Sequence, residues 1–166
     1  MTRRHRIMFV VITLLACVGC DQQTKSLARE YLSGRDTVSY LDDTVRLDYT
    51  ENQGAFLSLG ASLPARWRAA VFTVGAGVGL AAILFYTLWG RNSGLVQVLG
   101  LSLICGGGLG NLMDRVLNHG YVRDFLNLGL GSWRTGIFNF ADAALMTGCV
   151  LLMTRALREW HADAPR

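Results

Sequence analysis

The chain has 166 residues, of which 51% are hydrophobic and only 17% are charged. A soluble domain of this length buries one core but does not carry several apolar runs close to 20 residues long, so this composition excludes an ordinary soluble protein. The net charge of +4 comes without a basic stripe and interleaved aromatic residues, so we expect no nucleic-acid partner. These features predict a single integral-membrane domain over residues 1–166.

The first apolar run, residues 7–20, follows the basic segment TRRHR at residues 2–6. A basic segment before an apolar one also describes a cleaved signal peptide, and CVGC at residues 17–20 allows a second interpretation, that the chain is itself a lipoprotein cut at Cys20. The helix-compatible continuation DQQTKSLAREYL favours an uncleaved transmembrane helix over residues 7–27.

Three later apolar segments predict three more transmembrane helices, over residues 67–89, 94–113 and 136–154. Gly75 and Gly79 form a G-x-x-x-G motif, which allows close approach of membrane helices. A run of glycines near the end of the third segment also predicts tight packing: Gly106, Gly107, Gly108 and Gly110. Residues 91–94 predict a short turn, and the polar tail from residue 155 is expected to be loosely ordered.

The polar segments between these helices show the alternation of short β-strands. Val38 and Tyr40, and then Val45, Leu47 and Tyr49, alternate with polar residues on either side of Asp42-Asp43, which predicts a hairpin. Residues 121–126 predict another strand, which Gly129 and Gly131 turn towards Trp133. The predicted fold class is therefore an all-α membrane protein with four transmembrane helices and a small extracytoplasmic β-rich element.

Basic residues are densest in the amino terminus, the 91–94 turn and the carboxy-terminal tail. The positive-inside rule then places both termini in the cytoplasm and the two β-containing loops on the outer face. The residues that define this side are Arg3, Arg4, Arg6, Arg91, Arg155, Arg158 and Arg166.

Three aspartates, Asp114, Asp124 and Asp142, lie within or between the last two apolar segments. Asp142 is about six residues into the fourth segment, which at helical rise is about 9 Å below its start. An ionisable residue at that depth is costly and is usually retained for a pathway, a partner or chemistry. The predicted topology brings Asp124 and Asp142 to the same outer side.

Two carboxylates at a partly dry site do not both ionise readily, so they can share one proton. That state suits peptide hydrolysis, because one carboxylate can accept a proton from water while the other donates to the carbonyl oxygen. The chain contains no G-x-S-x-G or H-E-x-x-H motif, and its histidines have no metal-ligand spacing, so we expect no metal and no cofactor. Two alternatives stay open: a small transporter with Asp142 as a proton or cation relay, and a structural membrane subunit.

The spacing of other polar residues would allow them to lie close to these aspartates. Asn139 and Asp142 are three residues apart on one helix face, and Asn111 and Arg115 are four apart, with Arg115 also suited to a helix carboxy terminus. Asp21 and Lys25, four apart, form either an interfacial ion pair or a polar brace beneath a site. Asn52 with Gly54 indicates either a simple turn or an amide delivered to a cleft.

Five motifs in order make the sequence resemble the lipoprotein signal peptidase family (signal peptidase II), the membrane aspartyl peptidases of bacteria. They are DQQTK from Asp21, ENQGAF around Asn52, GNLMDR from Gly110, VRDF around Asp124 and FNFADAA around Asp142. Each motif alone is weak, but all five in this order cover almost the whole chain.

The resemblance implies an enzyme of the bacterial cytoplasmic (inner) membrane that removes signal peptides from prolipoproteins. Its substrate would carry diacylglycerol on the lipobox cysteine and be cut just before that cysteine, and we expect it to act as a monomer in contact with membrane lipid. The resemblance makes Asp124 and Asp142 the catalytic pair. It also implies substrate contacts by Asn52, Gly54, Asn111, Arg115 and Asn139, with support from Asp21, Lys25 and Asp114.

Overall fold

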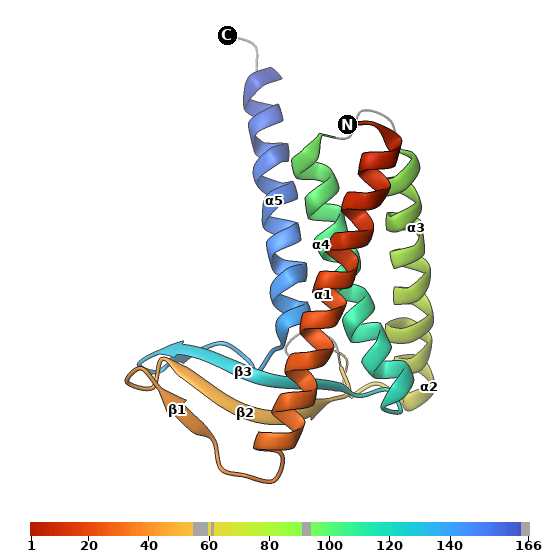
Figure 1. Cartoon of the computed structure of the whole chain (residues 1–166). Coiled ribbons are helices and arrows are strands. Elements are labelled where there is room, and N and C mark those ends of the chain that lie inside the picture. The colour runs from red at the N-terminus through yellow and green to blue at the C-terminus, as the bar shows by residue number, and fades with distance from the viewer. Residues whose placement is uncertain (55–59, 61, 91–93, 164–166) are drawn as a thin grey trace.

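The computed structural model describes residues 1–54, 60, 62–90 and 94–163, and within them four helical segments are long and apolar enough to cross a membrane (Figure 1). The first is α1 (Arg3–Leu32). The second is continuous through α2 (Ala65–Arg68), the π-helical η2 (Ala69–Gly75) and α3 (Ala76–Trp89). The third and fourth are α4 (Leu95–Leu117) and α5 (Phe140–Asp163). Together with a small antiparallel sheet, they confirm the predicted fold class.

Helix α4 is the most buried of the four spans and packs against α1, α3 and α5. Three consecutive glycines allow this. A Cβ atom would lie 2.6 Å from an α1 side chain at Gly106, 2.3 Å from the Ala141 carbonyl oxygen of α5 at Gly107, and 2.4 Å from a leucine of α3 at Gly108. Each glycine thus lets a different helix approach α4, which confirms the tight packing predicted from this run.

The packing role predicted for the G-x-x-x-G motif is wrong for contacts within the part of the chain that the structure describes. A Cβ at Gly79 would meet nothing within 4 Å, and one at Gly75 would meet only the carbonyl of Ala70 in its own span. The intervening Gly77 faces α4 instead, with Leu112 at 3.7 Å. The side-chain contacts with α4 set the rotation of this span, and they turn the motif away from its neighbours.

The sheet contains β1 (Val38–Tyr40), β2 (Val45–Asn52), β3 (Val122–Leu130) and β4 (Trp133–Arg134), antiparallel and in that order. The predicted hairpin is present, and its turn holds Asp42 and Asp43 at positive φ, which short polar side chains tolerate. Strand β3 continues beyond its predicted end at residue 126, and the chain reverses at Gly131, where φ is +58°.

Strands β2 and β3 join two loops that are far apart in the sequence. Thr50 pairs with Asp124 and Asn52 with Val122, after a register shift between Leu47 and Thr50. Because residues two apart on a strand share a face, Asn52 and Asp124 become diagonal neighbours across the ladder. Pairing of the two strands thereby brings an amide beside a carboxylate.

The sheet lies at one end of the helical bundle and projects to one side, and the amino terminus and the last turn of α5 lie towards the opposite end (Figure 1). Many large apolar side chains on the helices are exposed, including Leu15, Val78, Phe85 and Met153. Exposed apolar surface of this extent on long helices is what a lipid environment covers.

Helix α5 begins later and ends later than predicted. Before it, Phe138 exchanges backbone hydrogen bonds with Leu126 of β3, so the helix starts at Phe140 and Asp142 lies in its first turn. The expected depth of 9 Å for Asp142 is therefore wrong. At the other end, the tail expected to be loosely ordered is helical to residue 163, where Arg155 pairs with Glu159 at 2.8 Å. The predicted 91–94 turn lies outside the described residues except for Gly94.

Gly107→Ala should weaken the contact between α4 and α5, because the added Cβ would meet the Ala141 backbone. We expect a loss of about 1–3 kcal/mol in the free energy of unfolding, seen as a lower thermal midpoint of the purified protein in detergent. Gly79→Ala is the matched control, since its surroundings are open and alanine favours helix. Equal midpoints for the two variants would contradict this packing role.

Candidate active site

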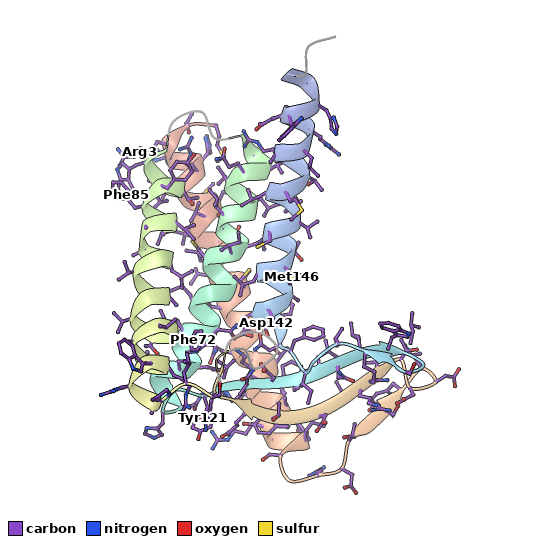
Figure 2. All side chains as sticks on the ribbon, turned by 180° about the vertical axis from the view of Figure 1, so that it is seen from behind. Arg3, Phe72, Phe85, Tyr121, Asp142 and Met146 are labelled. Carbon is purple, nitrogen blue, oxygen red and sulfur yellow. The ribbon has the colours of Figure 1, made fainter. Side chains whose placement is uncertain are left out.

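Asp142 lies where the bundle meets the sheet, at the start of α5 (Figure 2). Asp124 comes to the same place on β3, and the side chains of both are nearly inaccessible, with 2% of Asp124 and 8% of Asp142 exposed. The two aspartates thus arrive from different elements, one from a strand and one from a helix.

Asn139 connects the two aspartates. Its side-chain Nδ2 donates to Asp124 Oδ1 at 2.6 Å, and its backbone N–H donates to Asp142 Oδ2 at 3.3 Å. In return the backbone N–H of Asp142 donates to Asn139 Oδ1 at 2.9 Å. This exchange is a capping box at the start of α5, so one pair of residues both begins the helix and orients the carboxylate.

Amide groups occupy further positions around both carboxylates. Asn52 Nδ2 donates to Asp124 Oδ2 at 3.1 Å, while its own Oδ1 accepts from the buried backbone N–H of Gly54 at 2.8 Å. Asn111 Nδ2 donates to Asp142 Oδ1 at 2.8 Å. The simple-turn interpretation of Asn52 is therefore insufficient, because the turn also directs its amide to Asp124.

Behind these amides lies a fully buried ion network. Lys25 Nζ contacts Asp21 at 2.7 Å and Asp114 at 3.2 Å, and it donates to Asn111 Oδ1 at 2.9 Å. Asp21 in turn accepts the backbone N–H of Ala141, next to Asp142, at 2.9 Å. The interpretation of Asp21 and Lys25 as an interfacial pair is wrong, because both side chains are 0% exposed. Spacing alone could not show this, since α4 and α5 cover the pair.

Arg115 links the end of α4 to the loop that follows β2. Its guanidinium donates to the carbonyl oxygens of Asn111 at 3.3 Å and Gly54 at 2.9 Å, and it lies over the ring of Phe72. The first contact is the helix-terminus role expected from sequence. The second holds Gly54 at the edge of the site.

Two residues of the site were not singled out from the sequence. Gln22 Nε2 donates to Asp21, Asp114 and the carbonyl oxygen of Gly110, at 3.1, 3.1 and 3.2 Å. Arg123 donates to Asp114 from its backbone N–H at 3.0 Å and from its guanidinium at 2.5 Å. Their positions in the sequence could have identified them, because Gln22 directly follows Asp21 and Arg123 directly precedes Asp124.

Burial and charge together affect the protonation of Asp124. Burial, and to a lesser extent the nearby Asp142 carboxylate, raise its pKa, the amides of Asn52 and Asn139 lower it, and the net result is a pKa of about 6. A carboxyl group with this pKa changes its protonation state in mildly acidic solution, which suits a proton donor and acceptor.

The model of a family described as signal peptidase (SPase) II matches residues 12–158. The chain belongs to the signal peptidase II family. It is therefore a peptidase, and its four apolar helices are those of a membrane enzyme.

Two relatives span almost the whole chain. A lipoprotein signal peptidase of Pelodictyon phaeoclathratiforme is 34% identical over 96% of this chain and 92% of its own length. A lipoprotein signal peptidase of Sphingopyxis alaskensis is 42% identical over 93% of this chain and 86% of its own length. A bacterial membrane enzyme solved by the in meso method at 2.3 Å resolution has the same fold. Its TM-score is 0.83, at 24% identity, covering 96% of this chain and 94% of that one.

The raised pKa of Asp124 should make the stability of this signal peptidase II member depend on pH. Because the pKa is higher in the folded chain (about 6) than its usual value of 3.8, Asp124 stabilises the fold fully below about pH 4, and this contribution is lost as pH rises through 6. The difference corresponds to at most about 3 kcal/mol. Between pH 4 and pH 7.5, the thermal midpoint of unfolding should fall further for the natural chain than for Asp124→Asn. Identical pH dependence in the two proteins would contradict the raised pKa.

Proposed function

We propose that the chain is an aspartic endopeptidase that removes signal peptides from diacylglyceryl-modified prolipoproteins, cutting just before the lipidated cysteine. Asp124 and Asp142 are its catalytic pair. The observation that carries the proposal is that two buried aspartates, from β3 and α5, are bridged by one asparagine at the end of a membrane bundle. Family membership and the names of the relatives support the same substrate class.

The position of Asp142 at the start of a helix suggests a division of roles between the aspartates. Asp142 lies in the first turn of α5, where the helix dipole favours negative charge, and it accepts amide hydrogens from Asn111 and Asn139. It is therefore the ionised partner, which accepts a proton from the attacking water. Asp124, with its pKa near 6, carries the shared proton and donates it to the oxygen of the scissile carbonyl.

The remaining residues of the site either bind the substrate peptide or hold the two catalytic aspartates in place. Asn52 is held against Asp124 and Arg115 against Gly54, and in this proposal these three residues contact the substrate backbone. Asn111 and Asn139 hold the carboxylates at a fixed orientation. Asp21, Lys25 and Asp114 support Asn111 and the start of α5 from below.

Lipid on the substrate explains why such a site lies at the end of a membrane bundle. The acyl chains hold the precursor in the bilayer, so its cleavage site meets the enzyme in two dimensions and in a restricted orientation. Immobilising the scissile bond in this way supplies much of the positioning that the reaction needs. Contact with membrane lipid is therefore part of substrate recognition in this proposal.

A proton or cation relay is less well supported. Such a relay needs polar groups that continue from Asp142 towards the other end of the bundle. Among the described residues, the buried polar side chains away from the site network are Thr87, Ser102 and Asn127. The hydroxyls of Thr87 and Ser102 donate to carbonyls of their own helices, and Asn127 belongs to the sheet.

Asp124→Asn or Asp142→Asn should reduce cleavage of a lipid-modified precursor by roughly 100-fold to 10,000-fold, because each variant removes one proton-transfer group. The measurement is cleavage by purified protein in detergent or liposomes, with lipid-modified and unmodified precursor peptides side by side. Asp42→Asn is the matched control, since Asp42 is an exposed turn aspartate at positive φ, where asparagine is tolerated.

Two results would each count against the proposal. Undiminished turnover in either variant would remove that aspartate from the catalytic pair. Equal cleavage of the unmodified precursor would show that diacylglycerol is not recognised.

We further propose that the chain acts as a monomer in the cytoplasmic (inner) membrane, as a single domain with both termini in the cytoplasm and the sheet outside. In a background with the four cysteines replaced by alanine, Asp42→Cys should react with a membrane-impermeant maleimide in spheroplasts. Thr2→Cys should react only after lysis. Labelling of Thr2→Cys before lysis would reverse the orientation.

A further inference from the structure

Arg123 is fixed by more hydrogen bonds than its position on a strand requires. Its backbone N–H donates to Asp114 Oδ2 at 3.0 Å, and its carbonyl accepts from Asn139 Nδ2 at 3.3 Å. Its guanidinium donates to Asp114 Oδ1 at 2.5 Å and to Gln22 Oε1 at 2.9 Å. Both backbone polar groups of Arg123 are thereby bonded to helices, the N–H to α4 and the carbonyl to the cap of α5.

The guanidinium also balances the charge of the buried network. Asp21 and Asp114 carry two negative charges, and Lys25 carries one positive charge. Arg123, whose side chain is only 12% exposed, supplies the second positive charge through Asp114. Without it, a fully buried Asp114 would share one ammonium with Asp21 and leave an unbalanced negative charge beneath the aspartate pair.

The same network reaches both aspartates. Asp124 follows Arg123 directly in β3, so the position of the Arg123 backbone determines where the Asp124 carboxylate lies. Asp142 is reached through Asp114, Lys25 and Asn111, whose amide donates to it. Arg123 therefore affects Asp124 through the backbone of β3 and Asp142 through the charges of the buried network.

We propose that Arg123 is a positioning residue for the aspartate pair. Its ion pair with Asp114 holds the start of β3 against α4 and keeps the buried network neutral, and Gln22 orients its guanidinium. The inference rests on the proposed peptidase function. Arg123 itself contacts neither the substrate nor the reacting atoms in this account.

The ionisable groups around Arg123 and Asp124 belong to four elements, and single substitutions at Arg123 leave all of them in place. They are Asp21 and Lys25 of α1, Asp114 and Arg115 of α4, Tyr49 and Glu51 of β2, and Asp142 of α5. Only Asp114 and Gln22 hydrogen-bond the Arg123 guanidinium among the described residues. Changes at Arg123 should therefore act mainly through Asp114.

Arg123→Gln should lower kcat for a lipid-modified precursor by about 10-fold to 100-fold and change KM by less than about threefold, because positioning is lost while the substrate contacts stay. The unbalanced negative charge favours protonated aspartates, so the pH profile of kcat/KM should move upward by about 0.5 to 1 pH unit. Arg123→Lys keeps the charge and should keep the natural pH profile.

Two further proteins complete the test. Arg46→Gln removes an arginine–aspartate pair that is on the same sheet but exposed, and it should leave kcat and the pH profile unchanged. Asp114→Asn/Arg123→Gln removes one charge of each sign, so it should return the pH profile to that of the natural chain. This double variant and Arg123→Lys carry the test if Arg123→Gln does not fold, and a shifted profile in either one would then overturn the proposal.

A folded Arg123→Gln protein with natural kcat and an unmoved pH profile would overturn the positioning role. That result is distinct from failure of the proposed function, which would appear as absent cleavage by the natural chain itself. A shift of equal size in Arg46→Gln would also overturn the role, because it would show that any arginine of the sheet has this effect.

Discussion

The buried ammonium group of Lys25 is the constraint on which the rest of the arrangement depends. A charge that is fully removed from water must be paired, and breaking such a pair by removing one partner typically costs about 3–5 kcal/mol. Lys25 is paired with Asp21 of its own helix and Asp114 of α4, and Asp21 also holds the first turn of α5. These contacts keep α1, α4 and α5 in one relative position. Lys25 also donates a hydrogen bond to Asn111, whose amide donates to Asp142, so the ammonium group helps to position the aspartate pair.

Close helix packing makes this polar cluster possible. The glycines of α4 bring three helices near enough for short side chains to reach one another, and a Cβ at Gly110 would lie 2.6 Å from Asp21 Oδ2. The site is therefore assembled where α1, α4 and α5 pack closely against one another. Its rigidity comes from helices, while β2 and β3 contribute Asn52 and Asp124 from the side. Such rigid support is what a catalytic pair needs, because small displacements of reacting groups are costly.

The stability of the fold and the proposed chemistry are opposed at Asp124. Burial beside a second carboxylate disfavours its ionised form, which costs folding free energy at neutral pH. The amides of Asn52 and Asn139 offset part of this cost. Retaining an acid in such surroundings is typical of functional sites, where the altered pKa serves proton transfer.

The sequence by itself determined the number of membrane helices, the β-hairpin and the family, because apolar run length, alternation and ordered motifs are local properties of the chain. Only the tertiary structure decided which polar groups meet. It buried the Asp21–Lys25 pair that spacing left ambiguous, and it turned the G-x-x-x-G face away from the other helices. It also placed Asp142 in a helix cap instead of deep in the span. The contacts of Arg123 were also decided only by the tertiary structure, since its partners Asp114 and Gln22 come from other elements. Contacts between distant segments leave no period or spacing in the sequence.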